Sequence, residues 1–526
     1  VIDTGVDYQH EDLSGNIWIN GGEIPGNEID DDGNGFVDDV HGCSVVSDNR
    51  SHSGDPIDLN GHGTHVAGII AATAYNGLGG VGVAFNTQIM AVRAVQYSGT
   101  LAIDDIAEGI LYAADNGAQV INMSFGGPHR SQVVEDALAV ALSRAVLVAA
   151  AGNSGAKTEM APNVPEAPSY PAALPWVIGV MATDRNNWYA PWSNYDSWVP
   201  TRIEYEAAAP GVDIFSTIPG NRYAAWSGTS MATPIVSGVA ALVRSYFNDP
   251  SVYSSRFVMG QVVGSATNMF PPLIDAHLAL SGAPTPNVWV LEDWLFDLPA
   301  VDAHNDDDGR IDAGERIHIA LELFNHWGFA SNLVVTLDPT VGVVGPNPYV
   351  TMITDTVDYG AIGPWNTADN GFTYDEEGVI VAVDRPFVFQ VATNCPNDHI
   401  INFQVIVRYQ NGLKPEDPTI YTNAYWSLTY PVMRGRDLPQ VISEDMDLTS
   451  EEYWLVPGPV LIEEGVTVTV GPGTQIQWGG VSEDPYNPGP QKGSILVRGT
   501  LLMEGTAEQP VSLFPSYLVS GQTTVI

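Results

Sequence analysis

The chain is poor in cysteine, in basic residues and in long hydrophobic runs, and each shortage excludes a class of protein. Cys43 and Cys395 are the two cysteines in 526 residues, too few for a disulfide framework or for a structural zinc site of several thiolates. Nineteen lysines and arginines oppose 62 aspartates and glutamates, and the net charge of −43 repels nucleic acids and anionic membrane surfaces. No apolar run reaches the roughly 18 residues that a membrane-spanning helix needs. We therefore expect no nucleic-acid partner and no membrane span.

The length of the chain and its two ends indicate a multidomain fragment. A chain of 526 residues exceeds one ordinary domain, and a hydrophobic content of 44% is enough for several packed cores. The sequence opens at Val1 with an apolar strand pattern, without Met or a signal sequence. It stops at Ile526 within a strand-rich pattern. We expect a longer parent protein.

The first region, residues 1–282, alternates strand and helix patterns. Three short apolar runs have the character of buried strands, and two stretches between them have a helical period: 87–95, 118–127 and 146–155 for the strands, 103–117 and 131–145 for the helices. This order predicts a doubly wound α/β fold with a parallel sheet and helices on both faces. Such sheets place functional residues at the carboxyl ends of their strands.

Two strand-rich regions follow a proline-rich break at 281–288. In residues 283–436 the apolar residues alternate with a period of two, as in Ile317, Ile319, Leu321 and Leu323 and in Ile401, Phe403, Val405 and Val407. This pattern predicts an Ig-like β-sandwich. In residues 437–526 the stretches 465–480 and 493–514 resemble two rungs of one repeat with Gly-Thr corners, which predicts the start of a parallel β-helix or β-solenoid.

The stretch NGHGTHVAGI (60–69) holds two histidines, His62 and His65, within small and apolar residues. A metal site, a catalytic base and a pair of core histidines are three interpretations. A zinc-binding helix would place its histidines four apart with a glutamate between them. Here they are three apart, without a nearby glutamate or cysteine cluster, so a metal site is disfavoured.

A catalytic base needs a hydroxyl or thiol nucleophile and an acid that orients it. Asp3 ends an apolar strand before a glycine turn, and Ser230 stands at a turn that enters an apolar helix. Asn153 follows a third strand and offers a side-chain donor for an oxyanion. Each feature alone is commonly a turn or a helix N-cap.

Together these segments resemble the subtilisin-like serine proteases. The motifs stand as Asp3-Thr-Gly, His62-Gly-Thr-His-Val-Ala-Gly and Gly-Thr-Ser230-Met-Ala-Thr-Pro, in the family's order of Asp, His and Ser. The resemblance covers about residues 1–280. It implies a peptide-bond hydrolase with Asp3, His62 and Ser230 as the catalytic triad and Asn153 in the oxyanion hole. His65 is then a helix residue of the motif without a catalytic role.

The resemblance also implies a substrate strand, formed by Ser124, Phe125, Gly126 and Gly127, that pairs with the peptide backbone. One departure is Ile235, which stands where the family usually has histidine after the proline of the serine motif. An α/β-hydrolase would need Gly-x-Ser-x-Gly with its serine before the acid and the histidine, and neither condition holds. The rival interpretation is a non-catalytic adhesion or carbohydrate-binding protein that keeps a dead protease fold.

Two acidic stretches fit calcium loops, which take oxygen ligands at alternate positions around a glycine at position 6. In the first loop the candidate ligands are Asp30, Asp32, Asn34 and Asp38, with His41 at position 12; the alternative is a solvated turn. In the second the candidates are Asp306, Asp308, Asp312 and Glu315; the alternative is a flexible acidic linker. We expect structural calcium and no cofactor for catalysis.

These inferences predict a secreted or cell-surface serine endopeptidase that acts on proteins or peptides. The two strand-rich regions are expected to act as surface or targeting modules in contact with a cell surface or with glycans.

Overall fold

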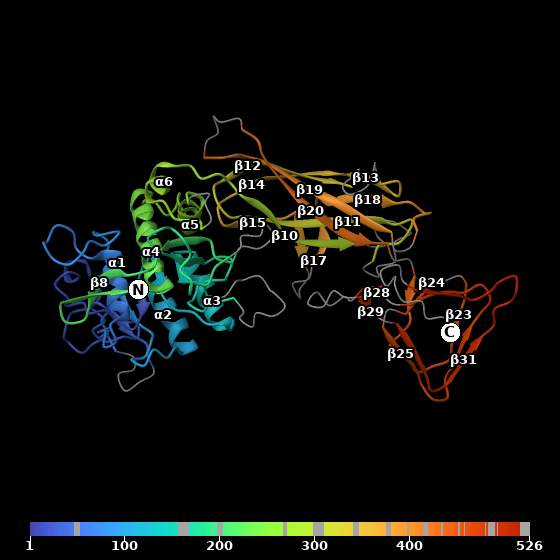
Figure 1. Cartoon of the computed structure of the whole chain (residues 1–526), viewed down its shortest axis with the longest axis horizontal. Helices are drawn as coiled ribbons and strands as arrows, with labels where there is room; N and C mark the ends of the chain where they lie inside the picture. Colours follow the sequence, from blue (N-terminus) through green and yellow to red (C-terminus); the bar gives the residue numbers. More distant parts are fainter. Residues whose placement is uncertain are drawn as a thin grey trace.

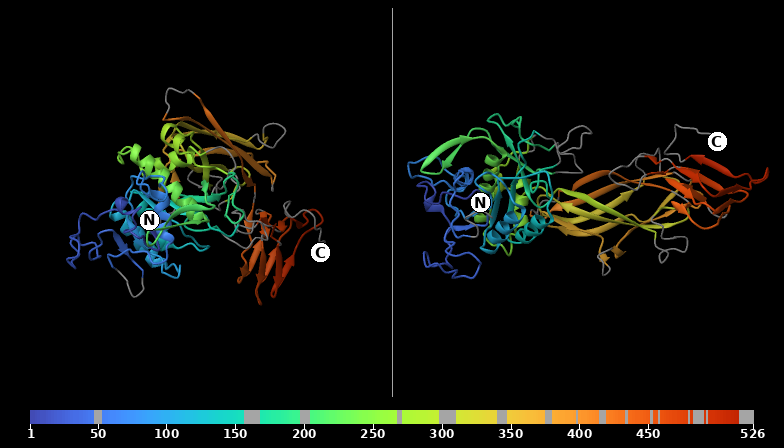
Figure 2. Two further views of the ribbon diagram at one scale, coloured as in Figure 1. Left: turned by 60° about the vertical axis from the view of Figure 1, so that its left-hand side comes forward. Right: turned by 90° about the horizontal axis from the view of Figure 1, so that it is seen from below.

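The computed structural model describes most of the chain. The residues outside the description are 47–52, 156–167, 197–203, 267–270, 298–309, 340–346, 375–379, 397–398, 414–418, 433–434, 451–452, 457, 479, 482–489, 492 and 516–526. Figure 1 shows three parts that follow one another along the long axis, and the right-hand view of Figure 2 shows the same order from below. The candidate calcium ligands Asp306 and Asp308 lie outside the described residues.

The first part is built on a seven-stranded parallel sheet in the order β2-β3-β1-β4-β5-β6-β7. Its strands are β1 (Ile2–Asp3), β2 (Gly42–Ser44), β3 (Ala91–Arg93), β4 (Val120–Met123), β5 (Val146–Ala150), β6 (Ile178–Thr183) and β7 (Ala207–Pro210). Nearly every strand residue is buried, as expected for a sheet covered on both faces. The predicted α/β fold is thus confirmed.

Six α-helices, one short 3₁₀ helix and one hairpin accompany the sheet in the described part of this region. They are α1 (His62–Ala71), α2 (Ile103–Asp115), α3 (Gln132–Leu142), α4 (Thr229–Tyr246), α5 (Ser255–Gly264) and α6 (Ala276–Ser281), the short 3₁₀ helix η1 (Ser14–Asn16), and the hairpin of β8 (Ile214–Ile218) and β9 (Arg222–Trp226). The helix predicted over 103–117 ends at Asp115, and the left-handed Gly117 with φ 83° turns the chain toward β4. None of the helices in the described residues is long and apolar enough to cross a lipid bilayer.

The second part consists of two antiparallel sheets that enclose a common core, which agrees with the predicted all-β character. One sheet contains β10 (Val288–Phe296), β11 (Arg316–Asn325), β13 (Val350–Thr354), β15 (Asn366–Ala368) and β18 (Phe387–Val391). The other contains β12 (Ala330–Asp338), β14 (Thr356–Ile362), β19 (Ile400–Asn411) and β20 (Tyr421–Pro431), and β16 (Phe372–Tyr374) pairs with β17 (Ile380–Val383). The alternating apolar residues of β11 and β19 are buried in this core.

The third part has three sheets of parallel strands (Figure 1). They are β21 (Arg436–Asp437) with β24 (Tyr453–Val456), β27 (Gln475–Trp478) and β32 (Ser512–Pro515); β22 (Val441–Ile442) with β25 (Pro459–Ile462) and β30 (Ser494–Val497); and β23 (Met446–Leu448) with β26 (Thr467–Val470) and β31 (Thr500–Met503). A short pair joins β28 (Gly480–Val481) and β29 (Pro490–Gln491). The parallel strands begin with β21, which lies before the first of the two predicted rungs at 465–480. The β-solenoid and the domain boundaries at 282 and 436 stay predictions.

Candidate active site

The carboxyl ends of three neighbouring strands carry three of the predicted site residues. Asp3 ends β1, Ser124 directly follows β4, and Asn153 lies in the turn after β5. Strand β4 pairs with both β1 and β5, so the three residues emerge at one edge of the sheet. The sheet thereby brings together positions that are far apart in the sequence.

Helix α1 begins with His62 and lies unusually close to the end of β1. A side chain at Gly63 would place its Cβ 2.1 Å from the Gly5 carbonyl oxygen and 3.0 Å from Asp3 Cβ, so this approach needs glycine. As a result His62 Nδ1 lies 2.7 Å from Asp3 Oδ1. The same oxygen accepts the Thr4 backbone N–H at 2.7 Å, and Asp3 is only 2% exposed.

This contact determines the electrostatics of the imidazole. Burial is the largest influence and lowers the pKa of His62, but the charge of Asp3, its hydrogen bond and the charge of Asp58 together outweigh burial. The pKa of His62 is therefore raised above its ordinary value. With Asp3 bound at Nδ1, the neutral ring carries its proton on Nδ1 and leaves Nε2 as an acceptor.

Ser230 is the second residue of α4 and lies beside β4. Pro234 lacks a backbone N–H, so it cannot donate the usual helical hydrogen bond to the Ser230 carbonyl. Ser124 Oγ donates to that carbonyl instead at 3.0 Å. This contact fixes the first turn of α4 against the edge of the sheet.

The Ser230 hydroxyl donates to the Ser124 carbonyl oxygen at 3.0 Å. Among the hydrogen bonds of the described residues, none joins Ser230 to His62. Catalytic hydrogen bonds are often long in a free enzyme and tighten when substrate binds. The Ser230 and His62 side chains line one open cavity of about 430 Å³.

Asn153 lines the same cavity, and its amide is oriented by Thr229. The Asn153 side-chain oxygen accepts the Thr229 backbone N–H at 2.9 Å and the Thr229 hydroxyl at 3.0 Å. The Nδ2 donors of Asn153 are therefore left for another acceptor. Thr229 was missed by sequence reasoning, because a threonine at a helix start has the same pattern as an ordinary cap.

Trp226, at the end of β9, forms a wall of this cavity and was also missed. Its ring stacks on His65 at 4.6 Å and on His62 at 6.4 Å between ring centroids. His65 is buried, with Nε2 3.1 Å from the Ala224 carbonyl, and burial lowers its pKa to about 4. His65 is thus a neutral histidine that joins α1 to β9.

The predicted substrate strand, Ser124 to Gly127, contacts Ser230 at its first residue and pairs with Tyr170 at its last residue. The Gly127 N–H donates to the Tyr170 carbonyl at 2.9 Å, and the Tyr170 N–H donates to the Gly127 carbonyl at 2.7 Å. Ser124 is buried and Gly126 is exposed. A Cβ at Gly126 would lie 2.6 Å from Ser169 Oγ and 3.1 Å from the Tyr170 carbonyl oxygen, so a side chain there would displace Ser169.

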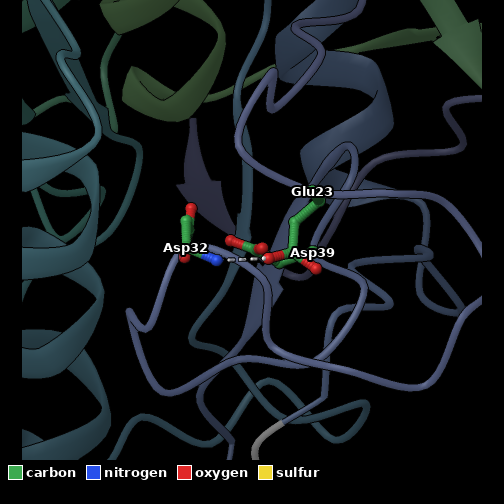
Figure 3. Close-up of side chains that lie close together, drawn as sticks. All are labelled: Glu23, Asp32 and Asp39. Carbon is green, nitrogen blue, oxygen red and sulfur yellow. Dashed lines mark hydrogen bonds between the residues drawn. The ribbon is translucent and has the colours of Figure 1, made fainter.

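The first acidic loop gathers a different set of carboxylates from the one that counting positions predicted. The ligand atoms of Glu23, Asp32 and Asp39 lie within 4.8 Å of one another. Figure 3 shows this cluster, in which Glu23 accepts the Asp32 backbone N–H at 3.2 Å. Asp30 and Asp38 instead accept backbone N–H groups of their own loop: those at Gly33, Asn34 and Gly35 for Asp30, and at Gly26, Asn27 and Glu28 for Asp38.

The other predicted ligands are distributed as follows. Asn34 donates through its side-chain amide to Asp39 at 2.9 Å, so it borders the cluster. In the second acidic stretch, the Asp312 backbone N–H donates to the buried Glu315 carboxylate at 2.7 Å. The calcium sites themselves stay predictions.

The fold and this site define a subtilase. The family model of the subtilases matches residues 1–278, and the chain belongs to this family. The predicted family is thus confirmed. Ile235, the residue that departs from the family pattern, is partly buried and packs against the core of the first region.

Several curated proteins are similar to this region. The "Thermophilic serine proteinase" of Bacillus sp. (strain AK1) is 45% identical over 246 residues, 47% of this chain and 51% of that protein. "Subtilisin BL" of Lederbergia lenta is 43% identical over 213 residues, 40% of this chain and 72% of that protein. "Thermitase" of Thermoactinomyces vulgaris is 39% identical over 246 residues, 47% of this chain and 74% of that protein. The chain thus spans about half the length of the thermophilic proteinase.

The electrostatic role of Asp3 is testable without an activity assay. Asp3→Asn removes the negative charge from the imidazole while burial remains, so the pKa of His62 should fall below its wild-type value. Proton NMR titration of the histidine rings measures this shift, with His62→Ala to assign the resonance. Asp55→Asn, which removes an exposed carboxylate, is the control. An unchanged His62 titration in Asp3→Asn would contradict the assignment.

Proposed function

We propose that the chain is a serine endopeptidase that hydrolyses peptide bonds of protein or peptide substrates through an acyl-enzyme. The observation that carries this proposal is the hydrogen bond of Asp3 to His62, whose side chain lines one cavity with Ser230 and Asn153. Membership of the subtilase family supports it.

In acylation, Ser230 Oγ attacks the carbonyl carbon of the scissile peptide bond. His62 Nε2 takes the hydroxyl proton, and Asp3 stabilises the resulting imidazolium at Nδ1. The negative charge that develops on the carbonyl oxygen is bound by Asn153 Nδ2 and by the Ser230 backbone N–H at the N-terminus of α4. The tetrahedral intermediate collapses, and His62 donates its proton to the leaving amine.

In deacylation, water takes the place of the amine. His62 Nε2 removes a proton from the water, which attacks the ester carbonyl, and the same oxyanion donors act again. The acid leaves, and the proton returns to Ser230 Oγ. Protein groups supply the nucleophile, the base and the oxyanion donors, so this mechanism needs no cofactor.

The segment from Ser124 to Gly127 is the proposed strand for the substrate backbone. An extended peptide could add beside this segment by main-chain hydrogen bonds, with alternate side chains directed into the cavity. The exposed Gly126 keeps the edge free of a side chain.

The rival, an adhesion or carbohydrate-binding protein with a dead protease fold, should have lost a group of the triad. Asp3, His62 and Ser230 are all present, so no observation favours this rival. Secretion or cell-surface attachment, and contacts of the later regions with glycans, stay predictions.

We further propose that the acidic cluster of the first loop holds a structural calcium ion. Glu23, Asp32 and Asp39 would be its ligands, since calcium selects carboxylate oxygens and three carboxylates repel one another without a cation. Glu23 and Asp39 are buried, where uncompensated charge is most costly. The ion would neutralise this charge and fix the loop that precedes β2.

Ser230→Ala removes the nucleophile, so peptidase activity should fall to the small residual rate that oxyanion binding alone supplies. The measurement is hydrolysis of a peptide library by the full-length, processed protein, together with labelling by a fluorophosphonate probe. Wild type should be labelled and Ser230→Ala should not. A variant that keeps activity within about tenfold would exclude Ser230 as the nucleophile.

Asn153→Leu keeps the branched shape and the number of side-chain heavy atoms and removes the oxyanion donor. We expect kcat to fall about 10²- to 10³-fold with KM nearly unchanged, which is the size of effect that loss of the oxyanion-hole asparagine has in subtilisin. Steady-state kinetics on one peptide substrate separate the two constants. An effect confined to KM would instead assign Asn153 to substrate binding.

Calcium should raise the melting temperature of the wild-type chain. At a concentration near 100 times Kd, one ion bound only to the folded state adds about 2.7 kcal/mol of stability. Asp39→Asn should reduce this gain, whereas Asp31→Asn in the same loop should keep it, because Asp31 lies outside the cluster. Calorimetry measures the melting temperature with calcium and with a chelator. Equal wild-type melting temperatures in the two conditions would rule out a calcium ion at this cluster.

A further inference from the structure

Asp58 is a buried carboxylate four positions before His62 that the mechanism above does not use. It is 3% exposed and lies in the segment that enters α1. A buried carboxylate is costly unless its oxygens accept hydrogen bonds. This one accepts five, and their donors come from two different segments of the site: Thr4 Oγ1 at 3.0 Å, Asn60 N at 2.9 Å, Gly61 N at 2.8 Å, Thr64 N at 2.9 Å and Thr64 Oγ1 at 2.6 Å.

One group of donors belongs to the start of α1. The N-cap residue of this helix is Gly61, which has no side chain to cap the free N–H groups. Asp58 replaces such a cap, because its two oxygens bind the N–H groups of Gly61 and Thr64. These residues flank His62 on both sides, so the carboxylate fixes the turn that carries the imidazole.

The Thr4 hydroxyl connects Asp58 to the segment that carries Asp3. Thr4 Oγ1 donates to Asp58 and at the same time accepts the Gly63 N–H at 2.9 Å. On the other side of Asp58, Thr64 Oγ1 accepts the Asp7 N–H at 2.9 Å. The chain after β1 is therefore joined to the first turn of α1 through Asp58 and these two hydroxyls.

We propose that Asp58 is a positioning residue that holds the Asp3 segment and the His62 turn in register, so that the imidazole stays on the Asp3 carboxylate. This inference rests on the proposed function. Asp58 has no hydrogen bond to the His62 ring among the described residues, so it acts through its neighbours and not on the substrate. Its negative charge has a second effect, because it helps to raise the pKa of His62.

The test compares Asp58→Asn with wild type. An asparagine has one acceptor oxygen in place of two. Its NH2 group would therefore point at N–H and O–H donors that now bind one of the two Asp58 oxygens, and those hydrogen bonds would be lost. We expect kcat to fall about 10- to 100-fold, the size of effect that a displacement near 1 Å produces, with a smaller change in KM. The acid limb of the kcat/KM profile should move to lower pH, because the pKa of His62 falls when the charge is lost.

Two controls separate positioning from a general loss of charge or of fold. Asp55→Asn removes an exposed carboxylate from the same segment and should leave both readouts unchanged. Thr4→Val keeps Asp58 and removes the hydroxyl that links it to Gly63, so kcat should fall, and Thr4→Ser should restore it. This pair keeps the inference testable if Asp58→Asn does not fold.

A spectroscopic readout distinguishes failure of this inference from failure of the proposed function. The low-field proton resonance of His62 Nδ1–H reports the Asp3 contact without any turnover. It should be lost or shifted in Asp58→Asn and Thr4→Val and retained in Ser230→Ala, even if the wild type proves inactive. An unchanged resonance in both variants, or wild-type kcat with an unmoved acid limb, would overturn the role of Asp58.

Discussion

The contact between the Asp3 carboxylate and the His62 imidazole is the constraint on which the rest of the site depends. Asp3 is almost completely buried, and its Oδ2 atom has no hydrogen-bond partner among the described residues. The carboxylate is therefore stabilised mainly through Oδ1, by His62 and the Thr4 N–H. Because a buried charge without such partners costs several kcal/mol, the chain must hold the imidazole close. The lack of a side chain at Gly63 and the cap supplied by Asp58 serve this requirement.

Two helices that begin at the same edge of the sheet carry the remaining groups of the proposed mechanism. The first turn of α1 carries the proposed base, and the first turn of α4 carries the proposed nucleophile and its backbone N–H. The positive end of the α4 dipole favours negative charge where an oxyanion would form. This local field acts in a protein whose formal net charge is −43. The oriented donors near Ser230 and Asn153 therefore matter more for the oxyanion than the overall charge, which dissolved salt screens over about 10 Å.

Sequence reasoning identified those parts of the fold and the site that have a local signature. The α/β order of the first region and the alternation in β11 and β19 follow directly from periodicity, and Asp3, His62 and Ser230 lie in long motifs. Asp58, Thr229 and Trp226 were missed because their roles arise from contacts across the fold, such as the stacking of Trp226 on His65. The acidic loop shows the same limit. Counting positions selected Asp30 and Asp38, whose carboxylates bind the loop's own N–H groups, whereas the cluster joins the predicted Asp32 with Glu23 and Asp39, which the count did not select.

The second region is packed against the first through apolar contacts as well as polar ones. Phe324 and Trp365 belong to the core cluster of the first region although they lie in the strand-rich region, and Trp365 is 2% exposed. Arg256 on α5 donates to the Trp365 carbonyl at 2.7 Å, and a Cβ at Gly260 would lie 2.6 Å from Pro364 Cβ. Burial of each large aromatic side chain stabilises by about 1.5–3 kcal/mol. These contacts join α5 to the segment of the second region that carries Pro364 and Trp365. Because α5 packs on α4, the helix that carries Ser230 is supported from the second region.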